Sequence, residues 1–542
     1  MKIDITYDKE YMVCSSEYPY ELQLLKRAMT REIANAWMLK KKQPHLNTER
    51  CFMNEYGMIP IGLWLNVLQF CKDCNMVCDM TDGMVAYINQ FQLDYEQFQI
   101  YVNHIFEDAM APVKDKNGNL TGEFKPFKPR DYQVKAAYTL LKYRKSCGEI
   151  STSAGKTLIS FIVFKYLVDT AGTNKVLYIV PSVDLATQSA EKYNEYESYL
   201  KNHGQPWEIG ILKSGLKKAE KAKVESCNIL FGTYQSLANK EQNFFTCFSG
   251  CIVDECHHSS SPSVKKVLTR CCNSKCTIGI TGTFPKKDKI EYLTLQSYIG
   301  PVVYTLTANE LINIEKAATP IYIVFQIIDW MTIDEKRQLF YNRMQKIANP
   351  DDITLGNKLL KQEQDFINNS YIRLKFIGDM AIKMAKNTLI LFGDVKGEYG
   401  KKLMDYIKDN SDKDVYYIDG QTPNENREYY KYKMSEDSNG KTIIVGSIYT
   451  MGEGIDVPNI ESIFLVNSAK SERIVRQIVG RGLRNNAGKT KCVLYDFVDD
   501  GKYSEDPKKK QYNNYMWNHY TARKNIYKEQ NFPIYEQKYK FW

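Results

Sequence analysis

The segment Ser151-Thr152-Ser153-Ala154-Gly155-Lys156-Thr157 is a loop of small residues that ends in a lysine and a hydroxyl residue. In this pattern backbone N–H groups surround a polyphosphate, the lysine reaches its β- and γ-phosphates, and the hydroxyl faces Mg²⁺. The first glycine of the usual pattern is replaced here by Ile150. The segment therefore predicts a nucleotide site in which Ser153, Gly155 and Lys156 surround phosphate and Thr157 faces the metal.

A second segment supplies the carboxylates that the same chemistry needs. The apolar run Cys251-Ile252-Val253 is predicted to be a buried strand, and it leads directly into Asp254 and Glu255. Phosphoryl transfer needs one carboxylate for the metal and a group that orients the attacking water. We therefore expect ATP and Mg²⁺ as cofactors, with Lys156, Asp254 and Glu255 as catalytic residues and Thr157 and Asp254 at the metal.

The composition is that of a globular protein without membrane segments. No apolar run in the 542 residues reaches the ~18–20 residues that a membrane helix needs. The N-terminus lacks the apolar core of a signal peptide, and the fourteen cysteines are expected to stay reduced. The net charge of +9 is compatible with a polyanionic partner. We expect a cytoplasmic protein with no membrane contact.

Strand and helix patterns alternate from Phe127 onwards, which indicates parallel sheets flanked by helices. The segment Ala317-Ala318-Thr319-Pro320 separates two such runs. We predict an α/β fold with two tandem parallel-sheet lobes, a small N-terminal α/β domain and a basic, aromatic C-terminal tail. The expected domain boundaries are 1–113, 114–318, 319–501 and 502–542.

Polar residues follow several predicted strands. Pro181 and Ser182 follow the strand 176–180, Thr233 to Ser236 follow the strand 228–232, and Thr281 and Thr283 follow or end the strand 277–280. Ligands collect at the carboxyl edge of open parallel sheets, and helix N-termini at that edge favour phosphate. Helix capping by Ser182 and Ser236 is the alternative. We expect Thr281 and Thr283 to link a nucleotide site to a polymer site, and Thr422, after the strand 415–418, to touch phosphate.

Gln133 lies at the start of a helix predicted from about Val134 to Lys145, in the segment Lys128-Pro129-Arg130-Asp131-Tyr132-Gln133. An amide can pair with both the donor and the acceptor on an adenine edge, which a phosphate loop cannot do. We therefore expect Arg130 and Gln133 to bind the nucleotide. An exposed N-terminal helix residue is the alternative for Gln133.

Three polar residues of the second lobe fall on one predicted helix face. Gln477, Arg481 and Arg484 are spaced i, i+4, i+7 in Gln-Ile-Val-Gly-Arg-Gly-Leu-Arg. Two guanidiniums one turn apart can bracket a γ-phosphate, and an arginine delivered to phosphoryl transfer contributes about 10³–10⁵ in rate. We expect all three to be catalytic; a surface arginine pair is the alternative.

The two ends of the chain allow two interpretations each. The N-terminal domain either docks nucleic acid or serves as a scaffold. In the C-terminal 41 residues the run Lys508-Lys509-Lys510 is interleaved with aromatics such as Tyr512, Trp517 and Tyr527. This suits a surface that tracks a backbone and stacks bases, but the same aromatics would also serve to pack a C-terminal helix against the second lobe.

These motifs, taken in order, resemble those of the superfamily 2 helicases across roughly residues 125–500. The set is Gln133, STSAGKT (151–157), IVPS (179–182), GTYQS (232–236), DECH (254–257), TGT (281–283), GEGID (452–456) and QIVGRGLR (477–484). The resemblance is strongest to a phage branch with a small N-terminal domain. In many relatives a hydroxyl residue stands where this chain has Ile448, so Ser447 or Thr450 is expected to take its place.

The resemblance implies two RecA-like lobes with ATP between them and nucleic acid across the top. It implies that Asp254 holds the metal through water, that Glu255 activates the attacking water, and that Gly454 and Asp456 lie near the nucleotide ribose. The residues implied along the polymer path are Pro181, Ser182, Thr233, Gln235 and Thr422.

The expected function is that of an ATP-dependent DNA helicase or translocase of the DEAH-like type. By resemblance it unwinds or remodels forks, Holliday junctions and R-loops in replication, recombination and repair. We expect a monomer whose partner is DNA, with RNA only in R-loops, in the host cytoplasm if the chain is phage-encoded. The alternatives are the motor subunit of a restriction system, an RNA helicase, and a non-catalytic nucleic-acid clamp or annealing factor.

Overall fold

The computed structural model describes residues 2–541 except 9, 34–35, 37–38, 41–42, 44, 90–92, 115–119, 144, 172–174, 201–206, 214, 258–261, 272–275, 315–316, 394–397, 438, 453–459, 467–470, 485–488 and 507–510. The chain forms two compact units. The first combines Met1–Pro112 with Phe124–Leu306, and the second combines Val113–Glu123 with Thr307–Trp542. Within the described residues, no helix combines the length and the apolar character needed to cross a membrane.

The first unit begins with a small four-stranded sheet in the order β5-β2-β1-β6. Its strands are β1 (Lys2–Asp8), β2 (Tyr11–Ser15), β5 (Met58–Pro60) and β6 (Val77–Met80). The pair β3 (Thr30–Glu32) and β4 (Glu49–Cys51) forms a separate two-stranded sheet. The accompanying helices are α1 (Pro19–Ala28), α3 (Trp64–Asp73), α4 (Asp82–Ile88) and α5 (Tyr95–Ile105).

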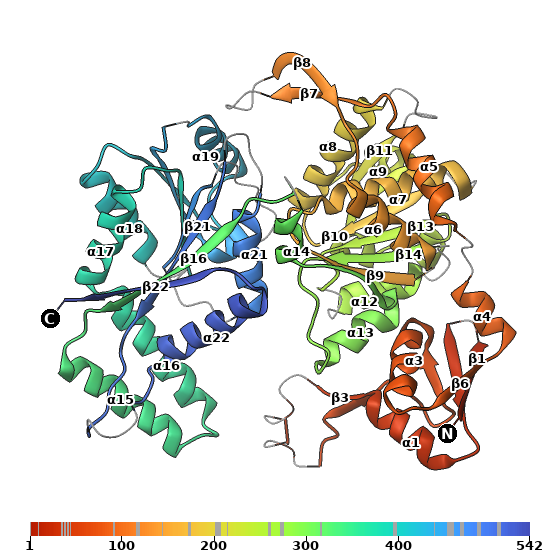
Figure 1. Cartoon of the computed structure of the whole chain (residues 1–542), viewed down its shortest axis with the longest axis horizontal. Coiled ribbons are helices and arrows are strands. Elements are labelled where there is room, and N and C mark those ends of the chain that lie inside the picture. The colour runs from red at the N-terminus through yellow and green to blue at the C-terminus, as the bar shows by residue number, and fades with distance from the viewer. Residues whose placement is uncertain are drawn as a thin grey trace. The chain divides into compact units, whose positions relative to one another are not determined.

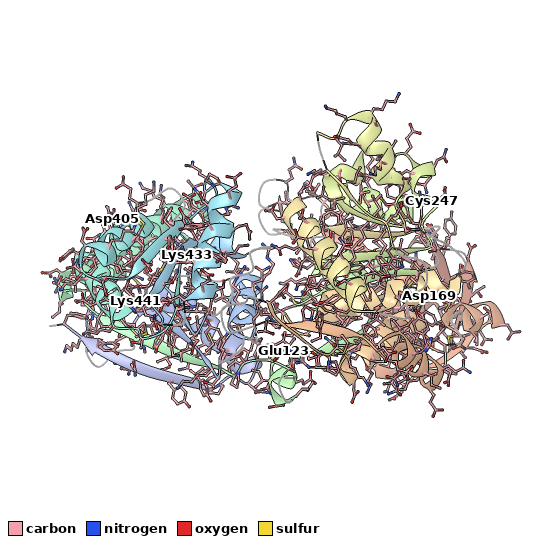
Figure 2. The ribbon with its side chains drawn as sticks, turned by 90° about the horizontal axis from the view of Figure 1, so that it is seen from above. Glu123, Asp169, Cys247, Asp405, Lys433 and Lys441 are labelled. Carbon is pink, nitrogen blue, oxygen red and sulfur yellow. The ribbon has the colours of Figure 1, made fainter. Side chains whose placement is uncertain are left out.

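This N-terminal part shares its core with the rest of the first unit. Its apolar cluster includes Leu25, Ile59 and Trp64 and extends to Leu293 of α13 (Ile290–Ile299). Asp169, labelled in Figure 2, lies near the C-terminus of α7. Its carboxylate accepts a hydrogen bond from the Tyr101 hydroxyl of α5 at 2.7 Å. The N-terminal residues are therefore held by both apolar packing and a polar contact.

A seven-stranded sheet forms the centre of the first unit, with all neighbours parallel and the order β11-β12-β10-β13-β14-β9-β15. Helices flank the sheet (Figure 1). The strands are β9 (Lys145–Ile150), β10 (Val176–Val180), β11 (Ile209–Leu212), β12 (Ile229–Thr233), β13 (Gly250–Asp254), β14 (Cys276–Thr281) and β15 (Val302–Leu306). The longer helices are α6 (Asp131–Lys142), α7 (Lys156–Ala171), α8 (Val183–Tyr199), α9 (Lys218–Ser226) and α12 (Pro262–Arg270), with the short α10 (Tyr234–Ala238) and α11 (Gln242–Phe245).

The second unit contains another seven-stranded parallel sheet, in the order β18-β19-β17-β20-β21-β16-β22. Its strands are β16 (Ile321–Asp329), β17 (Thr388–Phe392), β18 (Asp414–Ile418), β19 (Thr442–Ser447), β20 (Ser462–Leu465), β21 (Cys492–Asp499) and β22 (Ile534–Lys540). Its helices are α14 (Ala308–Asn313), α15 (Ile333–Ala348), α16 (Ile353–Asn368), α17 (Tyr371–Ile382), α18 (Tyr399–Asp409), α19 (Asn424–Glu436), α20 (Ile448–Gly452), α21 (Glu472–Gly482) and α22 (Tyr515–Glu529). The strands β7 (Met110–Lys114) and β8 (Leu120–Pro126) form a two-stranded sheet that lies in sequence between the N-terminal part and the first seven-stranded sheet.

The C-terminal residues complete the second sheet. β22 pairs in parallel with β16 over its whole length, and α22 packs on the sheet through a buried ion pair. Arg523 donates from Nε and Nη2 to Asp496 at 2.8 and 2.6 Å, and the Tyr527 hydroxyl donates to the same carboxylate at 3.1 Å. Tyr520 and Tyr527 are buried. The structure therefore favours the packing interpretation for these aromatics; Lys508-Lys509-Lys510 lies outside the described residues.

Candidate active site

The loop 151–155 connects the end of β9 to the start of α7 at the carboxyl edge of the first seven-stranded sheet. The Ser151 N–H donates to the carbonyl of Leu306 in β15 at 2.9 Å, which fixes the loop to the neighbouring strand. Two residues of the loop have positive φ, 75° at Ser153 and 80° at Gly155. Ser153 is strained because a residue with a Cβ disfavours this region. A Cβ at position 155 would lie 2.3 Å from Gln133 Nε2, so only glycine fits there.

Gln133 lies against this loop rather than in solvent. Its amide oxygen accepts the Arg130 backbone N–H, and its amide nitrogen donates to the carbonyl of Ala154, both at 2.9 Å. The Tyr132 hydroxyl donates to the same carbonyl at 3.1 Å, and its oxygen accepts from the Arg130 guanidinium at 3.3 Å. With 5% exposure, Gln133 is not the surface residue of the alternative interpretation. Among the described residues, one N–H and one lone pair of this amide have no partner.

Lys156 and Glu255 meet at the same edge of the sheet. Lys156 Nζ donates to Glu255 Oε1 at 2.8 Å. Glu255 follows β13 and has a φ of 47°, an unusual backbone conformation for a residue with a side chain. Burial alone would raise the pKa of Glu255, but the Lys156 ammonium and a hydrogen bond from His257 lower it well below its usual range. Glu255 is therefore an ionised carboxylate next to a lysine that stays charged.

Asp254 is the last residue of β13 and is 5% exposed. Its Oδ2 accepts the Tyr178 hydroxyl at 3.0 Å, and its Oδ1 accepts the Glu255 N–H at 2.9 Å. Burial raises the pKa of Asp254, and the nearby Lys156 opposes this rise. Within the described part of the chain, the Thr157 hydroxyl has no hydrogen-bond partner. A lysine, a carboxylate pair and this hydroxyl are thus gathered at the carboxyl ends of β9 and β13, which β14 separates in the sheet.

A polar network joins Glu255 to the end of β14. His257 Nδ1 lies 2.8 Å from Thr281 Oγ1 and 3.3 Å from Glu255 Oε2. Thr281 Oγ1 also lies 3.3 Å from Glu255 Oε2, and Thr283 Oγ1 lies 3.4 Å from His257 Nδ1. Thr281 therefore contacts the Glu255 carboxylate directly, whereas Thr283 contacts His257. Sequence reasoning gave no role to His257 or Tyr178; for His257, its place in Asp-Glu-Cys-His was the available signal.

The residues predicted along a polymer path in the first unit lie at the ends of β10 and β12, which are neighbours in the sheet. Ser182 caps α8 by accepting the Leu185 N–H at 3.3 Å, and Thr233 caps α10 by accepting the Ser236 N–H at 3.2 Å. Ser182 thus acts as a helix cap, as the alternative interpretation states. At the second strand the cap is Thr233, and Ser236 completes the capping box by accepting the Thr233 N–H at 3.0 Å. Pro181 is half-buried, and Gln235 is exposed at the same edge.

In the second unit, α21 presents Arg481 and ends at Gly482, before Arg484. The end of this helix is fixed by two groups. The Thr319 hydroxyl donates to the Arg484 carbonyl at 3.0 Å, and the Lys489 ammonium donates to the carbonyls of Gly482 and Arg484 at 2.7 and 3.0 Å. Cations at a helix C-terminus are favourable. Arg481 is buried, whereas Gln477 and Arg484 are half-buried.

Burial lowers the pKa of both Arg481 and Arg484 to about 10, so both guanidiniums are charged at neutral pH. A buried arginine is not the surface pair of the alternative interpretation. Thr422 lies in a loop after β18 and is half-buried. Gly454 and Asp456 lie outside the described residues.

Comparison with known proteins matches two segments of the chain to families. Residues 126–286 match "Type III restriction enzyme, res subunit", and residues 373–486 match "Helicase conserved C-terminal domain". The DNA 3'-5' translocase XPB2 of Sulfurisphaera tokodaii is 23% identical over 69% of this chain and 82% of its own length. The DNA-bound Type ISP restriction-modification enzyme LlaBIII shares the fold, with a TM-score of 0.52 and 15% identity over 78% of this chain and 32% of its own.

The two matched domains, in this order and each on a seven-stranded parallel sheet, make the chain a member of the superfamily 2 helicases. The protein is therefore an ATP-dependent helicase. The ATP-dependent DNA helicase uvsW of Enterobacteria phage T4 is 26% identical over 88% of this chain and 87% of its own length. This is the phage branch that the sequence motifs indicate.

Proposed function

We propose that this chain is an ATP-dependent DNA helicase or translocase that unwinds or remodels branched DNA. The observation that carries the proposal is the ion pair of Lys156 with Glu255, 2.8 Å long, beside Asp254 at the carboxyl edge of the first sheet. A lysine that binds phosphates, a metal carboxylate and a carboxylate that activates water are the groups that phosphoryl transfer requires.

In this proposal the triphosphate replaces Glu255 as the partner of Lys156. The ammonium is attracted more strongly to a polyanion than to one carboxylate, so Glu255 is released to accept a proton from water. Mg²⁺, when bound, would neutralise charge on the phosphates. The Thr157 hydroxyl and the Asp254 carboxylate fit that ion, since hydroxyl and carboxylate oxygens suit it. The left-handed backbone at Ser153 and Gly155 turns the loop around the phosphates.

We further propose that Gln477, Arg481 and Arg484 act on the same nucleotide. Both guanidiniums keep their charge despite burial, and Thr319 and Lys489 hold the end of their helix. Gly454 and Asp456 are proposed at the ribose, and Arg130 and Gln133 at the base. The domain limits 1–113, 114–318, 319–501 and 502–542 remain predictions.

The proposed polymer is DNA, contacted through Pro181, Ser182, Thr233, Gln235 and Thr422. Two relatives support DNA as the substrate, because the phage protein is named a DNA helicase and the archaeal one a DNA translocase. We propose forks, four-way junctions and R-loops as the branched forms, a monomer as the active species, and the cytoplasm, of a host if the chain is phage-encoded, as its location.

The test is strand separation with ATP on a fork, a four-way junction, an R-loop, blunt duplex DNA and an RNA fork, with Lys156→Ala as the blank. We expect the branched DNA substrates to be separated faster than blunt duplex, and no separation by the variant. Equal rates on blunt and branched DNA would contradict the branched-DNA assignment. Separation of the RNA fork alone would make it an RNA helicase, and Mg²⁺-dependent DNA cleavage would indicate a restriction motor.

A further inference from the structure

Three cysteines of the N-terminal part lie in one layer, between α3 and the small four-stranded sheet. In that sheet Cys14 of β2 is opposite Ile5 of β1, and Ile5 is opposite Met80 of β6. Side chains two residues apart on a strand share a face, so Cys78 lies on the same face of the sheet as Cys14. Cys71 of α3 belongs to the apolar cluster that contains Cys14 and Ile5, and Cys78 packs against that cluster.

The turn between α3 and β6 brings Cys78 back to Cys71. The Met76 N–H donates to the Cys71 carbonyl at 2.7 Å, and the Asn75 N–H donates to the Lys72 carbonyl at 3.1 Å. Asn75 has a φ of 52°. These two hydrogen bonds around a left-handed residue form a Schellman motif, which ends a helix and reverses the chain. Because β6 begins directly after this motif, Cys78 returns alongside the last turn of α3.

The two thiols are hydrogen-bonded to each other, and they differ in character. The Cys71 thiol donates to the Cys78 sulfur, and this bond raises the pKa of Cys71 and lowers the pKa of Cys78. Burial adds to the rise at Cys71, which is 1% exposed, whereas Cys78 is only half-buried. The thiolate is the nucleophilic form of cysteine. An accessible cysteine with a lowered pKa, next to a second thiol, is the arrangement that peroxides oxidise most readily.

Other cysteines lack this combination of access and ionisation. Cys14 is buried, and burial together with Cys78 raises its pKa to about 12. Cys247, labelled in Figure 2, is exposed, but desolvation by its surroundings raises its pKa. Among the described residues, no three His, Cys, Asp or Glu side chains are placed to hold a metal ion. The arrangement at Cys71 and Cys78 is therefore that of a thiol pair rather than of a metal cage.

We propose that Cys78 and Cys71 are an oxidation site at which hydrogen peroxide forms a reversible disulfide. The Cys78 thiolate attacks one peroxide oxygen, the O–O bond breaks, and Cys78 becomes a sulfenic acid while the other oxygen leaves as hydroxide and is protonated to water. The Cys71 sulfur then attacks the Cys78 sulfur, an S–S bond forms, and the departing hydroxide takes the Cys71 proton.

In sum, two thiols lose two protons and two electrons, and one hydrogen peroxide becomes two waters. Exchange with a thiol reductant restores the pair. The inference goes beyond the proposed function and does not depend on it.

The test is exposure of the reduced full chain to a small excess of hydrogen peroxide, followed by alkylation of the remaining thiols, digestion and mass spectrometry. We expect a disulfide between Cys71 and Cys78 that dithiothreitol removes. Cys78 should be oxidised about tenfold or more faster than Cys247, because only the thiolate fraction reacts. With dimedone present, Cys71→Ser should accumulate the sulfenic acid adduct at Cys78.

Cys74→Ser is the matched control. Cys74 is half-buried and follows the end of α3 directly, next to the same turn, and its loss leaves the proposed pair intact. This variant should form the disulfide at the wild-type rate, whereas Cys78→Ser should leave Cys71 reduced. A wild-type chain in which Cys78 stays reduced while Cys247 is oxidised would overturn the inference. A disulfide from Cys78 to Cys74 or Cys14 in the wild type would overturn the role of Cys71.

Discussion

The two seven-stranded sheets have the same strand order and different chemistry at their edges. Counted from the first strand of each, both run 3-4-2-5-6-1-7 with all neighbours parallel. In the first sheet the cation Lys156 is already paired with Glu255. In the second, Arg481 and Arg484 are cations whose pKa burial has lowered. The same topology therefore serves two tasks, and the residues at the strand and helix ends decide which.

The difference also concerns how each sheet holds its charged residues. The first sheet uses strained backbone, at Ser153 and Glu255, to aim an ion pair. The second fixes the C-terminus of α21 with Lys489 and Thr319. We therefore expect substitutions in the first site to affect proton transfer, and those in the second to affect stabilisation of charge on the phosphate.

The largest effect should come from the second sheet. Arg481→Ala is expected to lower kcat for ATP hydrolysis by about 10³–10⁵-fold, the range for an arginine that stabilises phosphoryl transfer. Arg481→Lys should recover little of the lost kcat, because an ammonium cannot make the planar two-point contact that a guanidinium makes. Steady-state hydrolysis at saturating ATP measures both. Activity of Arg481→Ala within twofold of the wild type would mean that the second sheet shares the topology of the first without taking part in ATP hydrolysis.

Glu255→Gln should lower kcat by about 10²–10⁴-fold, the usual contribution of a general base. The variant should still bind ATP, because Lys156 loses a competing carboxylate and gains a neutral neighbour. Fluorescent-nucleotide binding together with hydrolysis separates the two effects. A parallel loss of binding and turnover would mean that Glu255 positions the phosphate loop instead of activating water.

In the second unit, loss of a buried ion pair should lower the free energy of unfolding more than loss of an exposed one. Arg523→Ala leaves Asp496 buried and unpaired, and is expected to cost about 3–5 kcal/mol of the free energy of unfolding. Arg337→Ala is the control, because its partner Asp334 is exposed and solvent screens such pairs. Urea unfolding compares the two. Equal losses would show that α22 is not anchored through Asp496.

A smaller effect is expected on the pH dependence of stability, and it arises from Glu363 in the second unit. Glu363 of α16 accepts N–H groups of Asn514, Tyr515 and Met516 at the start of α22, and burial, helped by Asp499, raises its pKa to about 7 from 4.5. Between these values the folded state keeps a proton that the unfolded state loses, so stability should fall as the pH rises through this window.

The size of the full effect is on the order of 3–4 kcal/mol, from a shift of this extent at about 1.4 kcal/mol per pH unit. Urea unfolding of the wild type and of Glu363→Gln at about pH 5 and pH 7.5 isolates it, since the variant cannot titrate at this position. The wild type should lose more stability than the variant. Identical pH dependence of the two proteins would show that Glu363 has an ordinary pKa.

The sequence was sufficient for the two parallel sheets, because the alternation of strands and helices is a local pattern. It was not sufficient for Gln133, whose amide folds onto the Ala154 carbonyl through a tertiary contact. The left-handed backbone at Glu255 has no local signal, since such φ values are typical of glycine. The role of β22 as a seventh strand depends on pairing with β16, some two hundred residues away. The hydrogen bonds between the Thr422 hydroxyl and Asp419 were likewise not predictable from the sequence.

The central claim is that nucleic acid controls ATP hydrolysis at Lys156 and Glu255. The direct measurement is the steady-state ATPase rate of the wild type as single-stranded DNA is added, with Lys156→Ala as the blank. A rate that rises with DNA and saturates, and that is absent from Lys156→Ala, is the expected result. A wild-type rate that does not change with DNA would contradict the account.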